Sequence, residues 1–191
     1  MTTTQSFPRT DGAGSAIDSA PAPDGMIKGL TRLARHFGYV VSFVTPKQMA
    51  FGSLGADGAT RHLERQIWLV DTIKPYGATT ADVLTHEVAH AMRHCLTPYD
   101  ELVRMNGAQI EIEAEAIAEI VTQNFGIDHS EAHARYIWDA GMFLPVGRLE
   151  EYAESDTVAI IAGSIVAAIK DPSIVKSMPR GHRRKIPARY L

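Results

Sequence analysis

The sequence predicts an α+β protein, in which a first helix and a small sheet precede a half built from helices. Two observations support this prediction. Short β-branched and aromatic runs, which are typical of strands, occur between residues 39 and 70. From residue 79 onward, longer segments place apolar residues at helical spacing instead. Strands and helices are therefore segregated along the chain, as in an α+β fold.

The chain of 191 residues suits one compact domain flanked by two tails. Residues 1–25 are rich in small and polar side chains, so we expect a disordered N-terminal tail. The domain is expected over residues 26–175. Its composition is that of an ordinary soluble protein, because 45% of the chain is hydrophobic and 21% is charged. Residues 176–191 form a basic C-terminal tail.

A helix and up to three strands are expected in the first part of the domain. The helix spans Met26–Phe37, where apolar residues share one face and Gly38 provides a stop signal. Tyr39–Val44 and the short apolar run Gln66–Val70 predict strands. Met49–Leu54 is a weaker candidate strand, because nearby glycines indicate turns; these are Gly52, Gly55 and Gly58.

Four helices are expected after residue 77. The first has Thr79 or Thr80 as its cap and Asp82 in its first turn, and it runs to about Cys95. The others are expected over Ala108–Phe125, closed by Gly126 in left-handed backbone, then over Ser130–Ala140 and Val158–Lys170. The last is the most apolar segment, but its dozen or so apolar residues are fewer than the roughly 20 of a membrane span, so we expect a buried core helix.

The segment His86-Glu87-Val88-Ala89-His90 places two histidines four residues apart on an expected helix. Four residues make about one helical turn, so both imidazoles project from the same face and can share one tetrahedral Zn²⁺ ion. Glu87 directly follows the first histidine, which places its carboxylate near the metal without making it a ligand. Glu87 is therefore the expected general base, which takes a proton from a water molecule activated by the metal.

The alternative interpretation of this motif is an exposed helix with two solvated histidines. The helix is largely apolar around the pair, through Val83, Leu84, Val88, Ala89 and Ala91. Imidazoles set among apolar groups need polar partners. The sequence therefore favours a metal centre with one Zn²⁺ per chain.

A third protein ligand is expected from the next helix. Glu111, Glu115 and Glu119 share one of its faces, whereas Glu113 points elsewhere. Three carboxylates on one face repel one another unless positive charge lies nearby, and a metal with its histidines would supply that charge. We expect Glu111 as the ligand and Glu115 as the acceptor of a hydrogen bond from a ligand histidine. The reverse assignment and a solvated acidic face both stay open.

Other residues near the motif are weaker candidates. His94 lies about 12 Å along the helix from His86, which is too far for both to bind one ion, so we expect it outside the ligand set. His133 and Tyr136 share a face of the helix over Ser130–Ala140, and either would stabilise an oxyanion if that helix covers the site. A surface histidine and a packed tyrosine are the alternative. His62 and His129 are weaker still, and Trp68 and Trp138 are expected in the core.

Two segments resemble a known family. Thr85-His86-Glu87-Val88-Ala89-His90-Ala91 resembles the His-Glu-Leu-Ala-His-Ala helix of the small zincins that include the ImmA/IrrE metallopeptidases and the metallopeptidase-like domain of ArdC antirestriction proteins. Residues 111–118, Glu-Ile-Glu-Ala-Glu-Ala-Ile-Ala, resemble their Glu-x-Glu-Ala helix. Residues 124–128 and Tyr136-Ile137 look closer to the ArdC-type branch. The likeness covers roughly residues 66–140.

The resemblance implies a zincin-like minimal metallopeptidase fold, with a small sheet packed on the active-site helix and a helical half after it. It implies Glu111 as the third zinc ligand, beside His86 and His90. It also implies a cytoplasmic protein of a bacterium, phage or plasmid. Such a protein would hydrolyse a peptide bond in a protein substrate, for example a repressor or a host defence factor.

Net charge and cysteine content exclude some classes of protein and some kinds of site. The net charge of −3 argues against a polycation that binds nucleic acid with its whole surface. The single cysteine, Cys95, excludes an internal disulfide and a cysteine-based zinc site, and it fits a reducing cytoplasm. We see no signal peptide and expect no membrane association.

The basic end of the chain motivates a second function. No acidic residue follows Asp171, whereas six basic ones do: Lys176, Arg180, Arg183, Arg184, Lys185 and Arg189. This run is either a solvated tail or a contact for nucleic-acid phosphates or an acidic partner. The alternative function is therefore a non-proteolytic zincin-fold protein, antirestriction or regulatory, that binds DNA or a protein partner.

Overall fold

The computed structural model describes residues 20–50, 57–73, 77–128 and 149–180. It has an α+β fold with a small mixed sheet and a helical half, as the sequence predicts. The helix expected over Ser130–Ala140 lies outside the described residues, as do residues 1–19 and 181–191 of the two expected tails. Within the described part of the N-terminal segment, Pro21 forms a β-bridge with Gly77.

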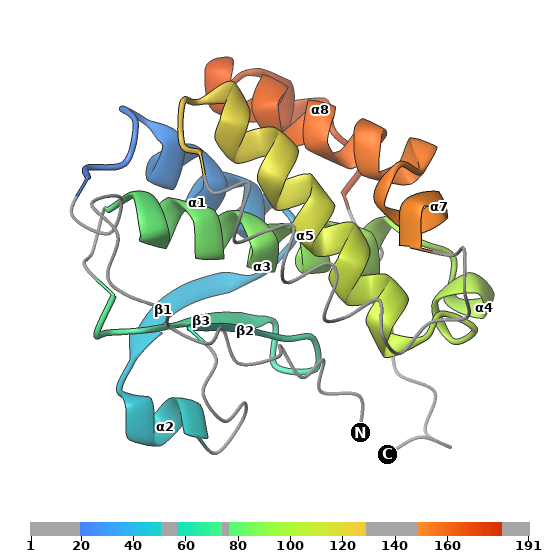
Figure 1. Cartoon of the computed structure of the whole chain (residues 1–191), viewed down its shortest axis with the longest axis horizontal. Coiled ribbons are helices and arrows are strands. Elements are labelled where there is room, and N and C mark those ends of the chain that lie inside the picture. Colours follow the sequence, from blue (N-terminus) through green and yellow to red (C-terminus); the bar gives the residue numbers. More distant parts are fainter. Residues whose placement is uncertain (1–19, 51–56, 74–76, 129–148, 181–191) are drawn as a thin grey trace.

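The described sheet has the strand order β1-β3-β2 (Figure 1). Strands β1 (Val40–Val44) and β3 (Gln66–Val70) run parallel and confirm the two stronger strand predictions. Strand β2 (Gly58–Arg61) pairs antiparallel with β3 and forms one edge of this sheet. The sequence pattern does not indicate β2, because a glycine such as Gly58 is more typical of a turn.

The strand expected over Met49–Leu54 is wrong in its described part. Met49 lies in the short helix α2 (Pro46–Ala50), and residues 51–54 lie outside the described residues. The Gln48 N–H donates to Thr45 Oγ1 at 3.3 Å, and the Thr45 N–H donates to Gln48 Oε1 at 3.0 Å. This reciprocal pair is a capping box, and proline suits the first helical position. The capping signal outweighs the strand tendency of the apolar residues.

The long helices lie close to their expected bounds. They are α1 (Met26–His36), α3 (Ala78–Leu96), α5 (Gly107–Asn124) and α8 (Asp156–Lys170). Gly126 follows α5 with a φ of 75°, which confirms the expected left-handed termination. The other short helices of the described residues are α4 (Tyr99–Leu102), α7 (Leu149–Ala153) and the 3₁₀ turn η2 (Ile174–Lys176), which the sequence analysis does not predict.

The start of α3 differs from the expected cap. Its N-cap is Gly77, so Thr79 and Thr80 lie inside the helix and Asp82 lies beyond the first turn. The Ala78 N–H donates to the backbone oxygen of Ala20 at 2.9 Å. Backbone from the preceding segment therefore satisfies a donor at the end of the helix that a side chain usually satisfies.

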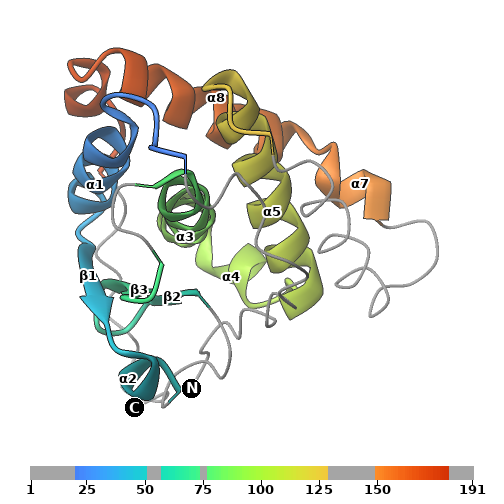
Figure 2. The same ribbon diagram turned by 60° about the vertical axis from the view of Figure 1, so that its left-hand side comes forward.

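Helix α3 is central to the fold (Figures 1 and 2). It lies on β2 and β3 on one side, and α1, α5 and α8 pack against its other sides. The core combines Ile67 and Leu69 of β3 with Leu84, Val88 and Met92 of α3. Because α3 is buried along most of its length, its polar residues need partners inside the protein.

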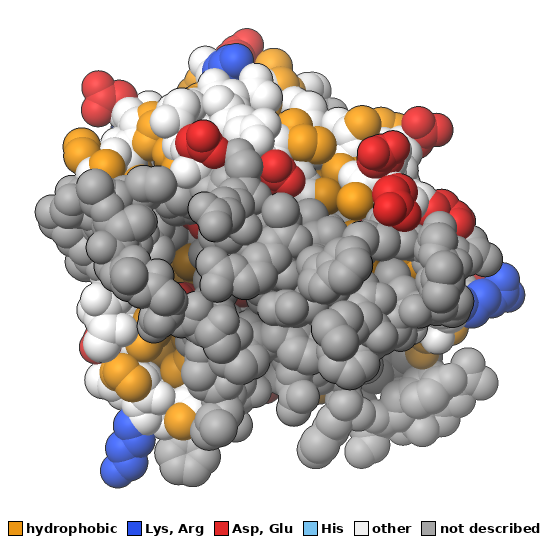
Figure 3. All heavy atoms as spheres, viewed as in Figure 1, with side chains coloured by type: hydrophobic (Ala, Val, Ile, Leu, Met, Phe, Trp, Pro, Cys, Tyr) orange, Lys and Arg blue, Asp and Glu red, His pale blue; other side chains and the backbone are white. Residues whose placement is uncertain are grey.

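One described segment, Glu150–Lys170, is long and apolar enough to cross a membrane by length and composition. Ser155 divides it as the N-cap of α8 and accepts from the Val158 N–H at 3.4 Å. Helix α8 packs on α1 and α5 and buries Ile161 and Ile165 in the core, as the sequence predicts for this helix. Acidic side chains gather near α7 on the face shown in Figure 3. Both α7 and α8 have acidic residues in their first turn, where negative charge interacts favourably with the helix dipole.

Candidate metal centre

Helix α3 places His86, Glu87 and His90 inside the protein. Their exposed fractions are 5%, 1% and 2%. The two histidines lie one turn apart, so their imidazoles point to the same side of the helix. Their Nε2 atoms are 2.9 Å apart. The motif is therefore not an exposed helix with two solvated histidines.

Helix α5 brings a carboxylate to the same point. Helices α3 and α5 lie side by side in both ribbon views (Figures 1 and 2). Glu111 Oε2 lies 3.5 Å from His86 Nε2, and Glu111 Oε1 lies 3.6 Å from His90 Nε2. His86, His90 and Glu111 thus form a buried group, with ligand atoms within 4.8 Å of one another, that could hold a metal ion.

The geometry of this group fits a tetrahedral metal. Zn²⁺ bonds of about 2.0–2.1 Å place neighbouring ligand atoms about 3.3 Å apart. The measured separations of 2.9, 3.5 and 3.6 Å lie on both sides of that value. Two imidazoles and one carboxylate are three ligands of types that zinc accepts, and they would leave the fourth position of a tetrahedral ion open.

Glu115, one turn further along α5, contacts the other nitrogen of His86. Its Oε2 lies 2.7 Å from His86 Nδ1, and its carboxylate is buried. A carboxylate only accepts, so His86 Nδ1 carries a proton, and in the neutral ring Nε2 presents its lone pair to the metal position. Of the two assignments that the spacing left open, this geometry favours Glu111 as the ligand.

The other glutamates of α5 have different partners. The Arg93 Nε–H donates to Glu113 Oε2 at 2.7 Å, and both side chains are buried. Arg93 also donates to Thr97 Oγ1 at 2.6 Å. Glu119 accepts from the Gln123 amide at 3.2 Å near the surface. The Arg93–Glu113 ion pair therefore connects α3 to α5. Glu119 takes part neither in this ion pair nor in the metal group.

Charges within the metal group shift its pKa values in the metal-free protein. Burial would lower the pKa of His86, but the carboxylates of Glu111 and Glu115 outweigh it and raise that pKa well above 6.5. Burial opposes ionisation of Glu111, yet His90 and His86 lower its pKa to about 2. For Glu87, burial dominates over the two histidines and raises the pKa. A raised pKa suits a general base that works near neutral pH.

His94 and His62 lie together outside the metal group. Their rings stack with centroids 4.2 Å apart, and Tyr39 Oη lies 2.9 Å from His62 Nδ1 and 3.3 Å from His94 Nδ1. His94 is therefore not among the ligand atoms near His86, as its distance along the helix predicts. The contacts of Tyr39 with His62 and His94 could not be predicted from the sequence, because these residues are 23 and 55 positions away and meet only in the fold.

The side chains of His129, His133, Tyr136 and Trp138 lie outside the described residues. Trp68 is half-buried and packs against a smaller core cluster that includes Val44 and Val70, while the Arg61 guanidinium lies 4.1 Å from its ring centroid, so the expectation of a core position is confirmed in part. Its neighbours Ile67 and Leu69 are fully buried, because alternate residues of β3 face opposite sides of the sheet.

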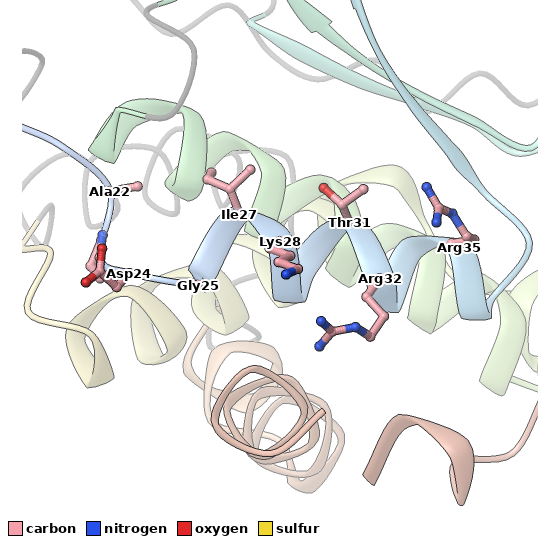
Figure 4. A pocket seen from close by; sticks show the side chains of 9 residues that line it. Ala22, Asp24, Gly25, Ile27, Lys28, Thr31, Arg32 and Arg35 are labelled. Atoms are coloured by element: carbon pink, nitrogen blue, oxygen red, sulfur yellow. The ribbon is translucent and has the colours of Figure 1, made fainter. Parts of the chain in front are cut away.

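A hollow runs along α1 (Figure 4) and shares no lining residue with the metal group. Its volume is about 640 Å³. Lys28, Arg32 and Arg35 of this helix are among the residues that line it. In the part of the chain that the structure describes, no ion pair joins these cations to an acidic side chain.

Comparisons with models of protein families, with curated proteins and with solved structures find no match to this chain. Its function is therefore inferred from the buried group on α3 and α5 and from the residues around it.

Proposed function

We propose that this protein is a zinc-dependent metallopeptidase, with His86, His90 and Glu111 as the metal ligands. The convergence of these three buried ligand atoms on one point carries the proposal. Burying two imidazoles and a carboxylate costs free energy that metal binding offsets. Glu87, buried on α3 between the two histidines, adds the base that a hydrolase needs and a structural site does not.

The likeness to the small zincins supports the same proposal. The resemblance implies an active-site helix on a small sheet, and α3 lies on β2 and β3. It also implies a third ligand from the next long helix, and α5 carries Glu111. The protein would thus have a gluzincin-type site, His-Glu-x-x-His followed by Glu. Its substrate would be a peptide bond in a protein, such as a repressor or a host defence factor.

Each residue has its own task in the proposed reaction. When bound, zinc would polarise the attacking water and the peptide carbonyl. Glu87 accepts a proton from the water and later gives it to the leaving amine. Glu115 holds the ring of His86 through Nδ1. Tyr136 and His133 stay the predicted oxyanion donors.

Zinc content and peptide hydrolysis, measured together, test the proposal. Wild type, Glu87→Gln and the surface control Glu119→Gln should each hold about one zinc per chain. With a peptide library read by mass spectrometry, only Glu87→Gln should lose cleavage, by roughly 10²–10⁴-fold. A wild type that holds no zinc after reconstitution would contradict the metal site. Cleavage by zinc-loaded Glu87→Gln at the wild-type rate would contradict the role of Glu87.

A binding function is the second candidate, and the hollow along α1 favours it. Lys28, Arg32 and Arg35 present three neighbouring cations that a polyanion such as DNA could contact. In that case the metal group would be structural. Salt-dependent DNA binding that survives Glu87→Gln but is lost when all three cations are replaced by alanine would support this function. A truncation that removes residues 176–191 separates the contribution of the basic tail.

A further inference from the structure

Strand β2 meets the active-site helix at Glu87. β2 is the edge of the described sheet, and it packs against α3. Gly58 and Thr60, two residues apart on this strand, face the same side of the sheet. Both lie against the side chain of Glu87. The strand therefore forms one wall of the site, although the sequence motif includes no residue from it.

Thr60 provides a hydrogen bond to the buried carboxylate. Its hydroxyl lies 2.7 Å from Glu87 Oε2 and 2.9 Å from the backbone oxygen of Glu87. Thr60 is 2% exposed and Glu87 is 1% exposed, so water does not compete for these contacts. The single hydroxyl proton is shared between the main-chain oxygen and the carboxylate of the same residue, which restricts the rotation of the side chain between them.

Gly58 leaves the room that this arrangement needs. A Cβ atom at this position would lie 2.8 Å from Glu87 Oε1, 2.9 Å from Glu87 Cγ and 2.7 Å from Val83 Cγ1. Any side chain there would require Glu87, Val83 or the strand itself to shift. Gly58 and Thr60 therefore define the position of Glu87 from two directions, one by excluding a side chain and one by a hydrogen bond.

We propose that Thr60 is a positioning residue, whose hydroxyl fixes the carboxylate of Glu87 in the orientation that the reaction uses. This inference rests on the proposed function, in which Glu87 is the general base. A base must stay within hydrogen-bond reach of the proton it removes, and a displacement of about 1 Å can cost 10²-fold in rate. Thr60 supplies that constraint without touching the metal or the reacting atoms.

The variants Thr60→Val and Thr60→Ser separate the hydroxyl from the shape of the side chain. Valine keeps the branched shape and removes the hydrogen bond, whereas serine keeps the hydroxyl. Thr122→Val is the matched control, because Thr122 is also fully buried but its hydroxyl bonds to the backbone of its own helix, α5. Crystal structures of the variants and the visible spectra of their Co²⁺ forms are the two readouts that need no substrate.

We expect Glu87 to leave its wild-type position in Thr60→Val and to keep it in Thr60→Ser and Thr122→Val. The Co²⁺ spectrum of Thr60→Val should move towards that of Glu87→Gln, with Co²⁺ affinity unchanged. For any peptide that the wild type cleaves, kcat should fall roughly 10–100-fold with little change in KM. An unmoved carboxylate in Thr60→Val would overturn the inference. A wild type that binds no Co²⁺ would instead overturn the proposed function, while the crystal structures still test the role of Thr60.

Discussion

Glu115 Oε2 lies 2.7 Å from His86 Nδ1, whereas His86 Nε2 faces His90 and Glu111. The carboxylate and the imidazole are both buried, so water does not weaken the bond between them. This contact fixes the orientation of the ring and the nitrogen that carries its proton, and both determine how well His86 can bind a metal. The affinity of the proposed centre should therefore depend on a residue that does not touch the metal.

Replacing Glu115 with alanine should weaken zinc binding by about 10–100-fold while one zinc per chain still binds at saturation. Titration against a chromophoric chelator measures this affinity. Glu119→Ala is the matched control, because Glu119 lies one turn further along α5 and its carboxylate accepts from the Gln123 amide near the surface. Equal affinities in wild type and Glu115→Ala would show that the hydrogen bond to His86 does not support metal binding.

Replacing Glu111 with alanine should reduce the zinc content far below one per chain. Two imidazoles would remain, and this is fewer than the three protein ligands of a catalytic zinc site. Metal analysis after dialysis, with Glu115→Ala titrated beside it, distinguishes the two glutamates. Loss of stoichiometric binding in Glu115→Ala and its retention in Glu111→Ala would mean that the two residues have the reverse roles.

Metal affinity should rise with pH around neutrality. The carboxylates of Glu111 and Glu115 raise the pKa of His86 in the metal-free protein well above its usual 6.5, so the ring keeps a proton above that pH and must lose it to bind zinc. Glu111, with a pKa of about 2, is already ionised and releases none. We expect about a tenfold gain in affinity per pH unit until the pKa of His86 is passed. Calorimetry in buffers of different ionisation enthalpy counts the released proton, and a count of zero would contradict this assignment.

The same groups link the stability of the metal-free protein to pH. The raised pKa of His86 gives stability that is complete below about pH 6.5 and is lost as pH rises through the folded value. The lowered pKa of Glu111 gives stability that is complete above about pH 4.5 and is lost as pH falls towards 2. Urea unfolding across pH should therefore show its highest midpoint between these limits. In His86→Ala the loss on the alkaline side should shrink.

The sequence predicts the metal group well because its signals are local. His86 and His90 need only helical spacing to share a face, and Glu111 with Glu115 needs only the same spacing on a second helix. The sequence could not decide which of the two glutamates binds the metal. Residue spacing shows which face of the helix a side chain is on, but not how far it lies from the histidines. That choice depends on how α3 and α5 pack, which brings Glu111 to the Nε2 side of His86 and Glu115 to its Nδ1 side.

The wall formed by β2 could not be predicted in the same way. The strand has four residues and begins with glycine, so neither its length nor its composition distinguishes it from a turn. Thr60 reaches Glu87 across 27 positions of sequence, and no local pattern records such a pairing. The strand prediction is wrong at Met49 for the opposite reason, because the capping pair Thr45 and Gln48 is local and visible in the sequence.

The buried pair of Arg93 and Glu113 should be a main determinant of how α5 sits on α3. The variant Arg93→Leu leaves a carboxylate that is 3% exposed without its cation, which should destabilise the metal-free protein by about 3–5 kcal/mol. Replacing both residues by leucine should restore much of that loss, because no unpaired charge remains. Glu101→Gln is the control, since Glu101 is 52% exposed and its ion pair with Arg93 should contribute less than about 1 kcal/mol. Urea unfolding measures all three, and a loss in Arg93→Leu no larger than in Glu101→Gln would mean that apolar packing alone holds the two metal-bearing helices together.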